Sequence, residues 1–204
     1  MIIKSIAFFG HSRAKQNSPS FQAAKRVARA VAESGRRVIN GGGPGIMLAA
    51  TLGAKEGGGK TTAVYYKPEL ATRFEKKSAL NFADERFEET NYITRTKRLL
   101  ELGNAYIIFN GSTGTISEFA MAWGVARLYF GHHKPLILYG NFWHHIIAAF
   151  KKNMRVRKEE FEVFTIVNSV YEAMRAVETY EVIMENNRHK HKKCIGDECQ
   201  FLLL

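Results

Sequence analysis

Three glycine-containing segments have the composition of loops that hold a phosphate group. Residues 10–13 are Gly-His-Ser-Arg, residues 41–45 are Gly-Gly-Gly-Pro-Gly, and residues 110–115 are Asn-Gly-Ser-Thr-Gly-Thr. Each follows a strand-like apolar run and precedes a helix-like segment, which would direct backbone N–H groups at an anion. Glycine has no Cβ to keep phosphate oxygens away from the backbone. Further hydroxyl donors are available from Ser12, Ser112, Thr113 and Thr115.

Ordinary tight turns are the alternative interpretation, and for a single glycine loop that interpretation is preferable. Two glycine-dense loops, each after a strand and before a helix, favour phosphate binding instead. Residues 54–61 fit a permissive Walker A pattern, but they lie between a helix and a strand, the reverse of the order that a P-loop needs. No G-x-G-x-x-G follows the first strand, and Asn40 stands where a dinucleotide-binding fold carries an acidic residue.

The elements that must position these loops alternate along the chain. Strand-like runs cover residues 2–9, 37–40, 61–66, 105–109, 135–139 and 161–167. Helical patterns cover residues 19–34, 46–56, 91–103, 115–130, 142–153 and 168–184. This alternation predicts an α/β fold, a Rossmann-like, doubly wound parallel sheet flanked by helices. In such a sheet, ligands bind outside the carboxyl ends of the strands, where the strand order reverses.

Two segments lie outside this alternation. Residues 67–90 are polar and mixed in charge, and we expect an irregular excursion or a short helix there. No linker divides residues 1–185, which predicts a single domain, and we expect residues 186–204 to form a loosely attached tail. The tail residues His189, His191, Cys194 and Cys199 match no standard zinc spacing, so we expect no metal site and no cofactor.

Composition narrows the class of protein. The chain has 204 residues, of which 46% are hydrophobic and 24% charged, the profile of a globular protein. Both cysteines lie in the tail, which excludes a disulfide framework. No apolar run is long enough for a transmembrane helix, and the N-terminus lacks the pattern of a signal peptide. We therefore expect a cytoplasmic protein without membrane contact.

The net charge of +11 is concentrated near the N-terminus. Residues 1–60 hold ten Lys or Arg and two acidic residues, a net +8, around two of the three loops. Some of these charges, such as Lys25, Arg26 and Arg29, would only solvate a helix, and the rest suit a phosphorylated small molecule. A basic run at residues 151–158 favours nucleic acid, but a solvated helix end explains it better, so we expect no nucleic-acid partner.

Two motifs resemble those of the LOG ("lonely guy") family, formerly labelled lysine-decarboxylase-like. Residues 41–47, GGGPGIM, are similar to the family signature GGGxxGxM, and residues 110–118, NGSTGTISE, are similar to PGGxGTxxE. Arg95 precedes Glu118 by 23 positions, the separation of the family's essential Arg and Glu. The resemblance extends over residues 2–184.

The resemblance implies a Rossmann-like homodimer that acts as a phosphoribohydrolase. Such enzymes cleave the N-glycosidic bond of a nucleoside 5′-monophosphate, AMP or a cytokinin riboside monophosphate, to free base and ribose 5-phosphate. Other members of the superfamily bind nucleotides or a molybdenum cofactor without hydrolysis, so a non-catalytic binding or carrier protein is the alternative. The family's dimer contact would fall on the helix with Met121, Trp123 and Leu128, an apolar stripe that core packing explains equally well.

The resemblance also implies site residues. Glu118 would stabilise an oxocarbenium-like state or orient the attacking water, and Arg95 would fix the substrate or stabilise the departing base. From residue type alone, Glu118 could instead complement a helix dipole, and Arg95 could lie on a solvated helix face. The phosphate or nucleotide would be bound by Gly41, Gly42, Gly43, Gly45, Met47, Gly111, Ser112, Thr113, Gly114, Thr115 and Ser12.

The sequence departs from the family pattern in the second motif and next to Arg95. Asn110 replaces its proline, Ser112 replaces its second glycine, and Thr96 replaces the lysine that follows the essential Arg. If position 112 needs a backbone that only glycine adopts, Ser112 would strain the loop. If it does not, the Ser112 hydroxyl adds a contact to phosphate.

Overall fold

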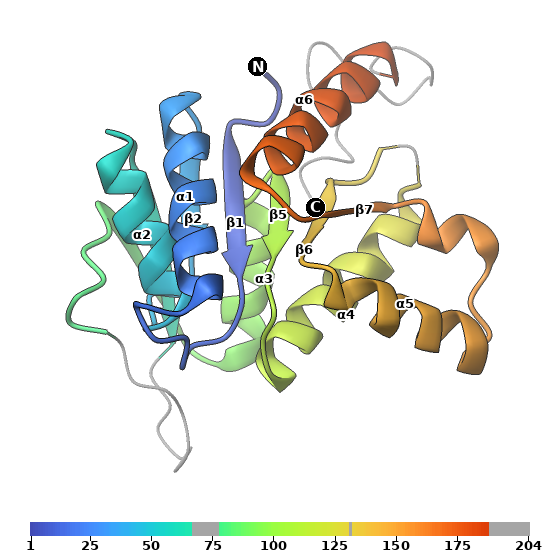
Figure 1. The fold of residues 1–204 in the computed structure, drawn as a ribbon, viewed down its shortest axis with the longest axis horizontal. Coiled ribbons are helices and arrows are strands. Elements are labelled where there is room, and N and C mark those ends of the chain that lie inside the picture. Colours follow the sequence, from blue (N-terminus) through green and yellow to red (C-terminus); the bar gives the residue numbers. More distant parts are fainter. Residues whose placement is uncertain (67–77, 131, 188–204) are drawn as a thin grey trace.

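Seven parallel strands form one sheet, which confirms the α/β, doubly wound architecture (Figure 1). The computed structural model describes residues 1–66, 78–130 and 132–187. The strand order is β4-β3-β2-β1-β5-β6-β7, so the direction of winding reverses between β1 and β5. The strands are β1 (Ser5–Phe9), β2 (Arg37–Asn40), β3 (Thr61–Tyr66), β4 (Glu85–Glu89), β5 (Ala105–Ile108), β6 (Leu136–Tyr139) and β7 (Phe164–Val167).

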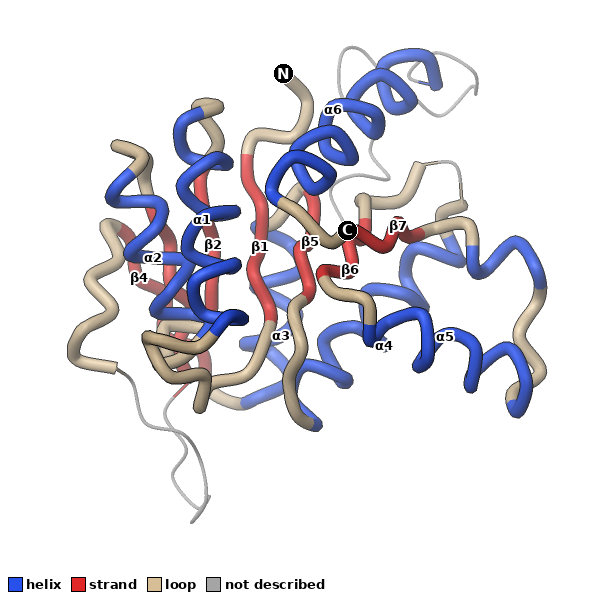
Figure 2. The backbone as a smooth tube through the Cα atoms, viewed as in Figure 1, coloured by secondary structure: helices blue, strands red, loops and turns tan. Residues whose placement is uncertain are grey.

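Helices cover both faces of the sheet (Figure 2). One core lies under α1, α2 and α6, and a second lies under α3, α4 and α5. Strand β1 serves both, because Ile6 and Phe8 enter the first core while Ala7 and Phe9 enter the second. The helices are α1 (Pro19–Glu33), α2 (Ile46–Glu56), α3 (Tyr92–Leu102), α4 (Thr113–Leu128), α5 (Phe142–Asn153) and α6 (Val170–Asn187), with a 3₁₀ turn at Lys158–Phe161.

Helix α3 shows how local sequence fixes an element that the site needs. The Asn91 side chain accepts hydrogen bonds from the N–H groups of Ile93 and Thr94, and the Thr94 hydroxyl is in turn within hydrogen-bond distance of the Asn91 N–H. This capping box satisfies N–H groups that have no partner within the helix. At the other end of α3, the Lys134 ammonium donates to the carbonyl oxygens of Leu100 and Glu101. The helix is therefore held at both ends.

The expectation of an irregular excursion or a short helix over residues 67–90 is wrong for residues 85–89, which form strand β4. This strand pairs in parallel with β3 and lies at the edge of the sheet. Its sequence, ERFEE, lacks the apolar character of a buried strand because one of its edges faces solvent. An ion pair between Arg37 and Glu85 anchors the strand instead.

Other boundaries shift only slightly. Helix α4 begins at Thr113 rather than at 115, and α6 continues through residue 187, two residues into the expected tail. Residues 188–204, with the His and Cys positions weighed for zinc, lie outside the described residues. The Walker-like residues 54–61 do run from a helix into a strand. Within the described ranges, no helix has both the length and the apolar character needed to cross a bilayer.

Candidate functional site

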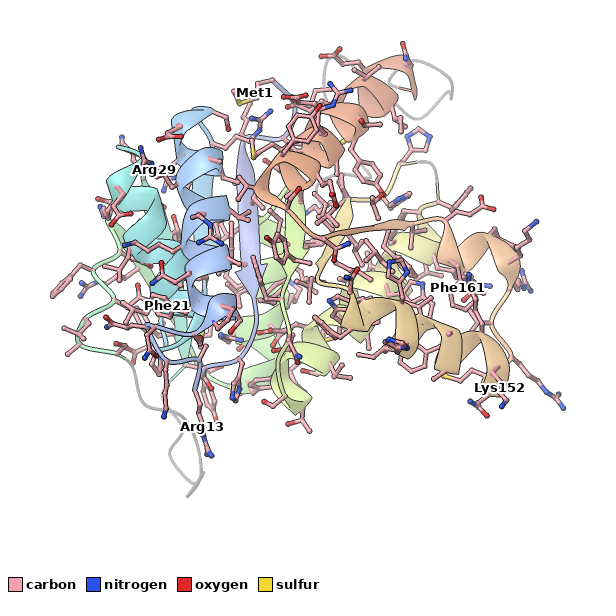
Figure 3. All side chains as sticks on the ribbon, viewed as in Figure 1. Met1, Arg13, Phe21, Arg29, Lys152 and Phe161 are labelled. Atoms are coloured by element: carbon pink, nitrogen blue, oxygen red, sulfur yellow. The ribbon has the colours of Figure 1, made fainter. Side chains whose placement is uncertain are left out.

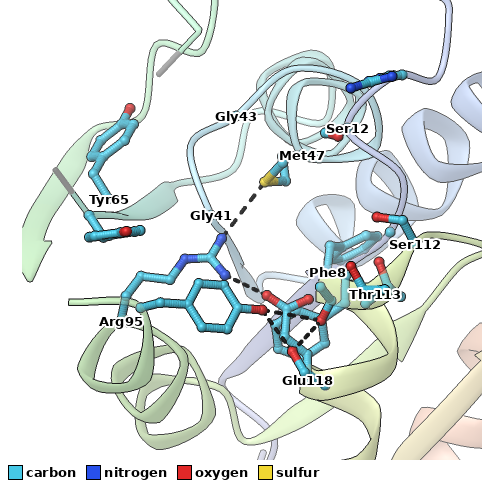
Figure 4. A pocket seen from close by; sticks show the side chains of 18 residues that line it. Phe8, Ser12, Gly41, Gly43, Met47, Tyr65, Arg95, Ser112, Thr113 and Glu118 are labelled. Carbon is cyan, nitrogen blue, oxygen red and sulfur yellow. Dashed lines mark hydrogen bonds and ion pairs between the residues drawn. The ribbon is translucent and has the colours of Figure 1, made fainter. Parts of the chain in front are cut away.

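A cavity of about 590 Å³ opens at the carboxyl ends of the strands, beside the reversal of strand order (Figure 4). All three glycine-containing loops contribute to its wall. Backbone hydrogen bonds tie these loops together, because the His11 N–H donates to the Asn110 carbonyl at 2.9 Å and the His11 carbonyl accepts from the Ile46 N–H at 3.0 Å. The position agrees with the general rule for ligand sites in doubly wound sheets.

Most of the predicted site residues line this cavity, and three do not. Gly42 packs against the Tyr65 ring, Gly111 packs against the Thr115 side chain, and Gly45 packs against the β1–α1 loop. Gly45 has a φ of +64°, and a Cβ there would lie 2.2 Å from the His11 carbonyl oxygen, so only glycine fits. The predicted residues that do line the cavity are Ser12, Gly41, Gly43, Met47, Arg95, Ser112, Thr113, Gly114, Thr115 and Glu118.

Arg95 and Glu118 form a buried ion pair in the wall of the cavity. The Arg95 Nη1 donates to the Glu118 Oε1 at 2.5 Å, and the Arg95 Nε donates to the Val64 carbonyl at 3.3 Å. Both side chains are buried, so neither the solvated-face interpretation of Arg95 nor a purely helix-dipole role for Glu118 describes their surroundings. Adjacent helices α3 and α4 thus bring together two residues that are 23 positions apart.

Burial raises the pKa of the Glu118 carboxyl above its usual range, and the Arg95 charge opposes this shift without cancelling it. Few water molecules can solvate such a carboxylate. Once ionised, it interacts more strongly with a nearby positive charge than a carboxylate in water does. The pair therefore offers both a carboxylate and a guanidinium to whatever occupies the cavity.

Gly41 makes room for the Arg95 guanidinium. A Cβ at Gly41 would lie 1.6 Å from the Arg95 Nη2, a distance that no side chain can accept. Met47 contacts the same nitrogen through its sulfur at 3.9 Å. From the sequence, the space that glycine leaves in this loop was expected to admit phosphate oxygens. At Gly41 this space instead holds a side chain of the protein itself.

The N-terminus of α4 faces the same cavity. Ser112 is the N-cap residue, with φ −101° and ψ −159°, and its side chain makes no capping hydrogen bond. This extended backbone is open to any residue, so Ser112 strains nothing, and the first of the two alternatives for position 112 is wrong. Ser112 and Thr113 are exposed and line the cavity, so their hydroxyl groups are accessible to a ligand.

Three tyrosines in the cavity wall were missed by sequence reasoning. Tyr65 and Tyr66 end strand β3, and Tyr92 begins α3 one turn before Arg95. The rings of Tyr66 and Tyr92 meet edge to face, with centroids 6.4 Å apart. Figure 4 shows Tyr65 and Ser112 on opposite sides of the cavity, with the Arg95–Glu118 pair between them. The available signal was the position of Tyr65 and Tyr66 at the carboxyl end of a strand.

Positive charge near the cavity is more limited than the net charge of the N-terminal segment implies. Arg13 is exposed and lines the cavity, and its side chain extends from the loop (Figure 3). Lys25 instead pairs with Glu56 at 2.6 Å, and Arg29 pairs with Glu33 at 2.7 Å. Arg29 lies on the exposed face of α1, as expected, whereas Lys25 links α1 to α2, and neither side chain lines the cavity.

Among residues 1–66, 78–130 and 132–187, no three His, Cys, Asp or Glu side chains gather in an arrangement that could hold a metal ion. The polar groups that the described residues bring to the cavity include the ion pair, the hydroxyl groups and the N-terminus of α4.

Solved structures with the same fold belong to proteins of differing function. The X-ray structure of TM1055, a structural-genomics target, aligns with a TM-score of 0.66 at 21% identity, covering 87% of this chain and 99% of that one. The molybdenum cofactor binding protein from Rippkaea orientalis aligns at 0.64 and 20%, covering 89% and 99%. DNA processing protein A from Helicobacter pylori, described with a single-stranded DNA binding mode, aligns at 0.55 and 14%, covering 86% and 80%. At these identities the likeness establishes the fold alone.

Sequence comparison identifies the family. An uncharacterised protein from Archaeoglobus fulgidus is 32% identical over 122 residues, which cover 59% of this chain and 76% of that protein. The sequence model of the SLOG cluster4 family matches residues 4–165, a range that includes both glycine motifs, Arg95 and Glu118. The chain therefore belongs to the SLOG cluster4 family, within the LOG-like superfamily.

Proposed function

We propose that this protein hydrolyses the N-glycosidic bond of a nucleoside 5′-monophosphate, AMP or a cytokinin riboside monophosphate, to free base and ribose 5-phosphate. The observation that carries the proposal is the buried Glu118 carboxylate, paired with Arg95, in the same cavity as the N-terminus of α4. A carboxylate beside an anion-binding helix end suits a phosphorylated sugar.

The arrangement of the cavity suggests how the substrate would lie. The phosphate would bind the N-terminal N–H groups of α4 and the hydroxyl groups of Ser112, Thr113 and Ser12. The ribose would then lie over Glu118, and the base would extend toward the tyrosines. Every part of this ligand would thus meet a surface of matching chemistry.

The reaction would use the two charged residues in different roles. As the C1′–N bond breaks, positive charge develops on the ribose ring, and the Glu118 carboxylate stabilises it or orients the attacking water. Arg95 stabilises the negative charge on the departing base. Water supplies hydroxyl to C1′ and a proton to the base, so atoms and charge balance.

A base-release assay tests the proposal. The purified protein is incubated with AMP, GMP, CMP and isopentenyladenosine monophosphate, and the free base and ribose 5-phosphate are quantified by chromatography. We expect equal amounts of base and ribose 5-phosphate from at least one purine nucleotide. Tight binding of all four without base release would contradict hydrolysis.

A non-catalytic nucleotide or cofactor carrier is the second candidate. It is favoured by Asn110 and Ser112, which replace a proline and a glycine of the LOG motif, and by the likeness to the molybdenum cofactor binding protein. Base release against binding alone in calorimetry separates the two candidates, because a carrier binds its ligand and leaves it intact. The leading proposal also holds that the ligand is a small phosphorylated molecule of the cytoplasm and that nucleic acid is not a partner. Strong, salt-sensitive binding of single-stranded DNA would contradict this part of the proposal.

We also propose that two copies associate through α4. Met121, Val125 and Leu128 are spaced to lie on one face of this helix and are 38%, 40% and 66% exposed, an unusual apolar stripe for a solvent face. Trp123, by contrast, packs into the core beside Phe119, as the core interpretation required. The double variant Val125→Asp, Leu128→Asp should sediment as a monomer while the unmodified chain sediments as a dimer; equal mass for both would contradict the interface.

A further inference from the structure

Three buried polar side chains form a closed network behind the glycine loop of residues 41–45. Asn40 ends strand β2, Thr51 lies on the inner face of α2, and Asn81 lies between β3 and β4. The Asn40 Nδ2 donates to the Thr51 Oγ1 at 2.9 Å, the Thr51 Oγ1 donates to the Asn81 Oδ1 at 2.6 Å, and the Asn81 Nδ2 donates to the Asn40 Oδ1 at 3.2 Å. None of the three is more than 2% exposed.

The network also binds the backbone of the loop. The Gly42 N–H donates to the Asn40 Oδ1 at 2.7 Å, and the Gly43 carbonyl accepts from the Asn81 Nδ2 at 3.1 Å. The Ser78 N–H donates to the Gly42 carbonyl at 3.2 Å, which adds a second contact from the same segment. The Gly42 N–H is therefore committed to the protein and does not point at a phosphate.

A direct structural path leads from the network to the ion pair. Gly41 is the residue between Asn40 and Gly42, and its missing Cβ is what admits the Arg95 guanidinium. Thr51 lies one helical turn after Met47, whose sulfur contacts the same guanidinium. A shift of the loop by a few tenths of an ångström would therefore move a wall against which Arg95 rests.

Buried polar groups are costly unless all their partners are supplied, and apolar side chains could fill this volume. A closed network instead fixes one conformation of the backbone to which it bonds. We propose that Asn40, Thr51 and Asn81 are positioning residues, which hold the 41–45 loop so that Arg95 stays aligned with Glu118. The 41–45 loop then supports the ion pair, and the phosphate binds at the N-terminus of α4. This inference rests on the proposed hydrolysis for its kinetic consequence alone.

Thr51→Val tests the proposal, because valine keeps the shape of threonine and removes the hydroxyl that joins the two asparagines. We expect kcat for base release to fall about tenfold, since small misalignments of catalytic groups are costly. The KM for AMP should change less than twofold, because the network bonds to the backbone of Gly42 and Gly43, whereas the phosphate is proposed to bind mainly at the N-terminus of α4. Thr51→Ser restores the hydroxyl and should restore kcat to within twofold.

Thr61→Val is the matched control. Thr61 is equally buried, and its hydroxyl donates to the Asp84 carboxylate at 2.9 Å, at the amino end of β3 and away from the cavity. This variant should lose stability and leave kcat unchanged. If Thr51→Val does not fold, Asn81→Ser serves in its place, because it removes the hydrogen bonds of Asn81 to Thr51, to Asn40 and to the Gly43 carbonyl.

Amide hydrogen exchange of the full chain gives a readout that does not depend on catalysis. Exchange of the Gly42 N–H should be at least about tenfold faster in Thr51→Val than in the unmodified chain, and unchanged in Thr61→Val. Unchanged Gly42 exchange, or faster exchange with unchanged kcat, would overturn the inference. If the unmodified chain releases no base while Gly42 exchange responds as expected, the network does hold the loop and the hydrolase proposal falls instead.

Discussion

Two buried Arg–Glu pairs lie at opposite ends of the parallel strands. Arg95 and Glu118 lie at the carboxyl ends, with side chains 10% and 8% exposed. Arg36 and Glu181 lie at the amino ends, with side chains 6% and 17% exposed and atoms 2.7 Å apart. Burial and charge are nearly the same for both pairs, so neither property distinguishes a functional pair from a structural one.

The surroundings of the two pairs differ. The Glu181 carboxylate also accepts the N–H groups of Ile2 and Ile3 at 3.1 and 3.0 Å, and the Arg36 Nε donates to the Ile3 carbonyl. This pair fastens the N-terminus to α6. Glu118, within the described ranges, has Arg95 as its partner and otherwise faces the cavity.

We propose that unused hydrogen-bonding capacity distinguishes Arg95–Glu118, as the pair that serves a ligand, from the structural pair Arg36–Glu181. A carboxylate whose oxygens already accept backbone N–H groups has less hydrogen-bonding capacity left for a ligand. A carboxylate that is buried, half-satisfied and open to a cavity retains that capacity. Variants of the two pairs and of residues around them break or sharpen this contrast.

Apart from a change at Glu118 itself, the largest effect on base release is expected from Arg95→Met. Methionine keeps much of the side-chain volume but removes the charge that would stabilise the departing base, so base release should fall about 100- to 1,000-fold. Initial rates from AMP, at equal concentrations of folded protein, measure the loss. Retention of a third of the original rate would remove Arg95 from the reaction.

Arg36→Met should produce the opposite result. It leaves Glu181 buried without its cation, which should lower the free energy of unfolding by about 3 kcal/mol. Urea denaturation measures this change, and base release per folded molecule should stay the same. A loss of activity greater than the loss of folded protein would show that the amino-end pair also serves the site.

Gly41→Ala should disturb the Arg95–Glu118 pair only by steric contact, because it changes neither charged residue. Its Cβ would displace the Arg95 Nη2, so kcat should fall about tenfold or more. Gly58→Ala is the control, because a Cβ there meets nothing within 4 Å and only its φ of +69° is unfavourable. If Gly41→Ala and Gly58→Ala have equal activity, the close approach at Gly41 does not matter for catalysis.

The smallest effect concerns a buried cation outside both pairs. Burial lowers the pKa of Lys134 to about 8, against a usual value of 10.5, although two carbonyl oxygens accept hydrogen bonds from its ammonium group. At a pH between these two pKa values, the Lys134 side chain is protonated more often in the unfolded chain than in the folded chain. The free energy of unfolding therefore rises with pH in this range. Relative to Lys134→Met, the unmodified chain should gain about 1–2 kcal/mol between pH 8 and 10 in urea denaturation. A flat difference would show that Lys134 is not desolvated.

Most of the fold could be predicted because the periodicity of apolar residues, and glycine at the ends of the elements, indicate the helices and strands. Strand β4 could not, since an edge strand needs no apolar run, and its charged sequence, ERFEE, is also typical of a solvated loop. The position of β4 also depends on pairing with β3, which is a long-range contact without a local signature.

The candidate site was predictable in its motifs and less so in its geometry. Arg95 and Glu118 were found because each belongs to a spaced pattern. Asn81 was missed because it lies in an irregular segment and acts only through contacts with Asn40 and Gly43. The role of Gly41 was misread for a similar reason, since no sequence pattern reveals which atom fills the space of a missing Cβ.

We propose that Glu118 performs chemistry that Glu181 does not, and the variant Glu118→Gln separates these two roles. Glutamine keeps the shape and can still accept a hydrogen bond from Arg95, but it cannot carry the charge that the oxocarbenium-like state requires. Base release from AMP should become undetectable while calorimetry still shows AMP binding within a few-fold of the unmodified chain. Base release at an unchanged rate by Glu118→Gln would contradict the account.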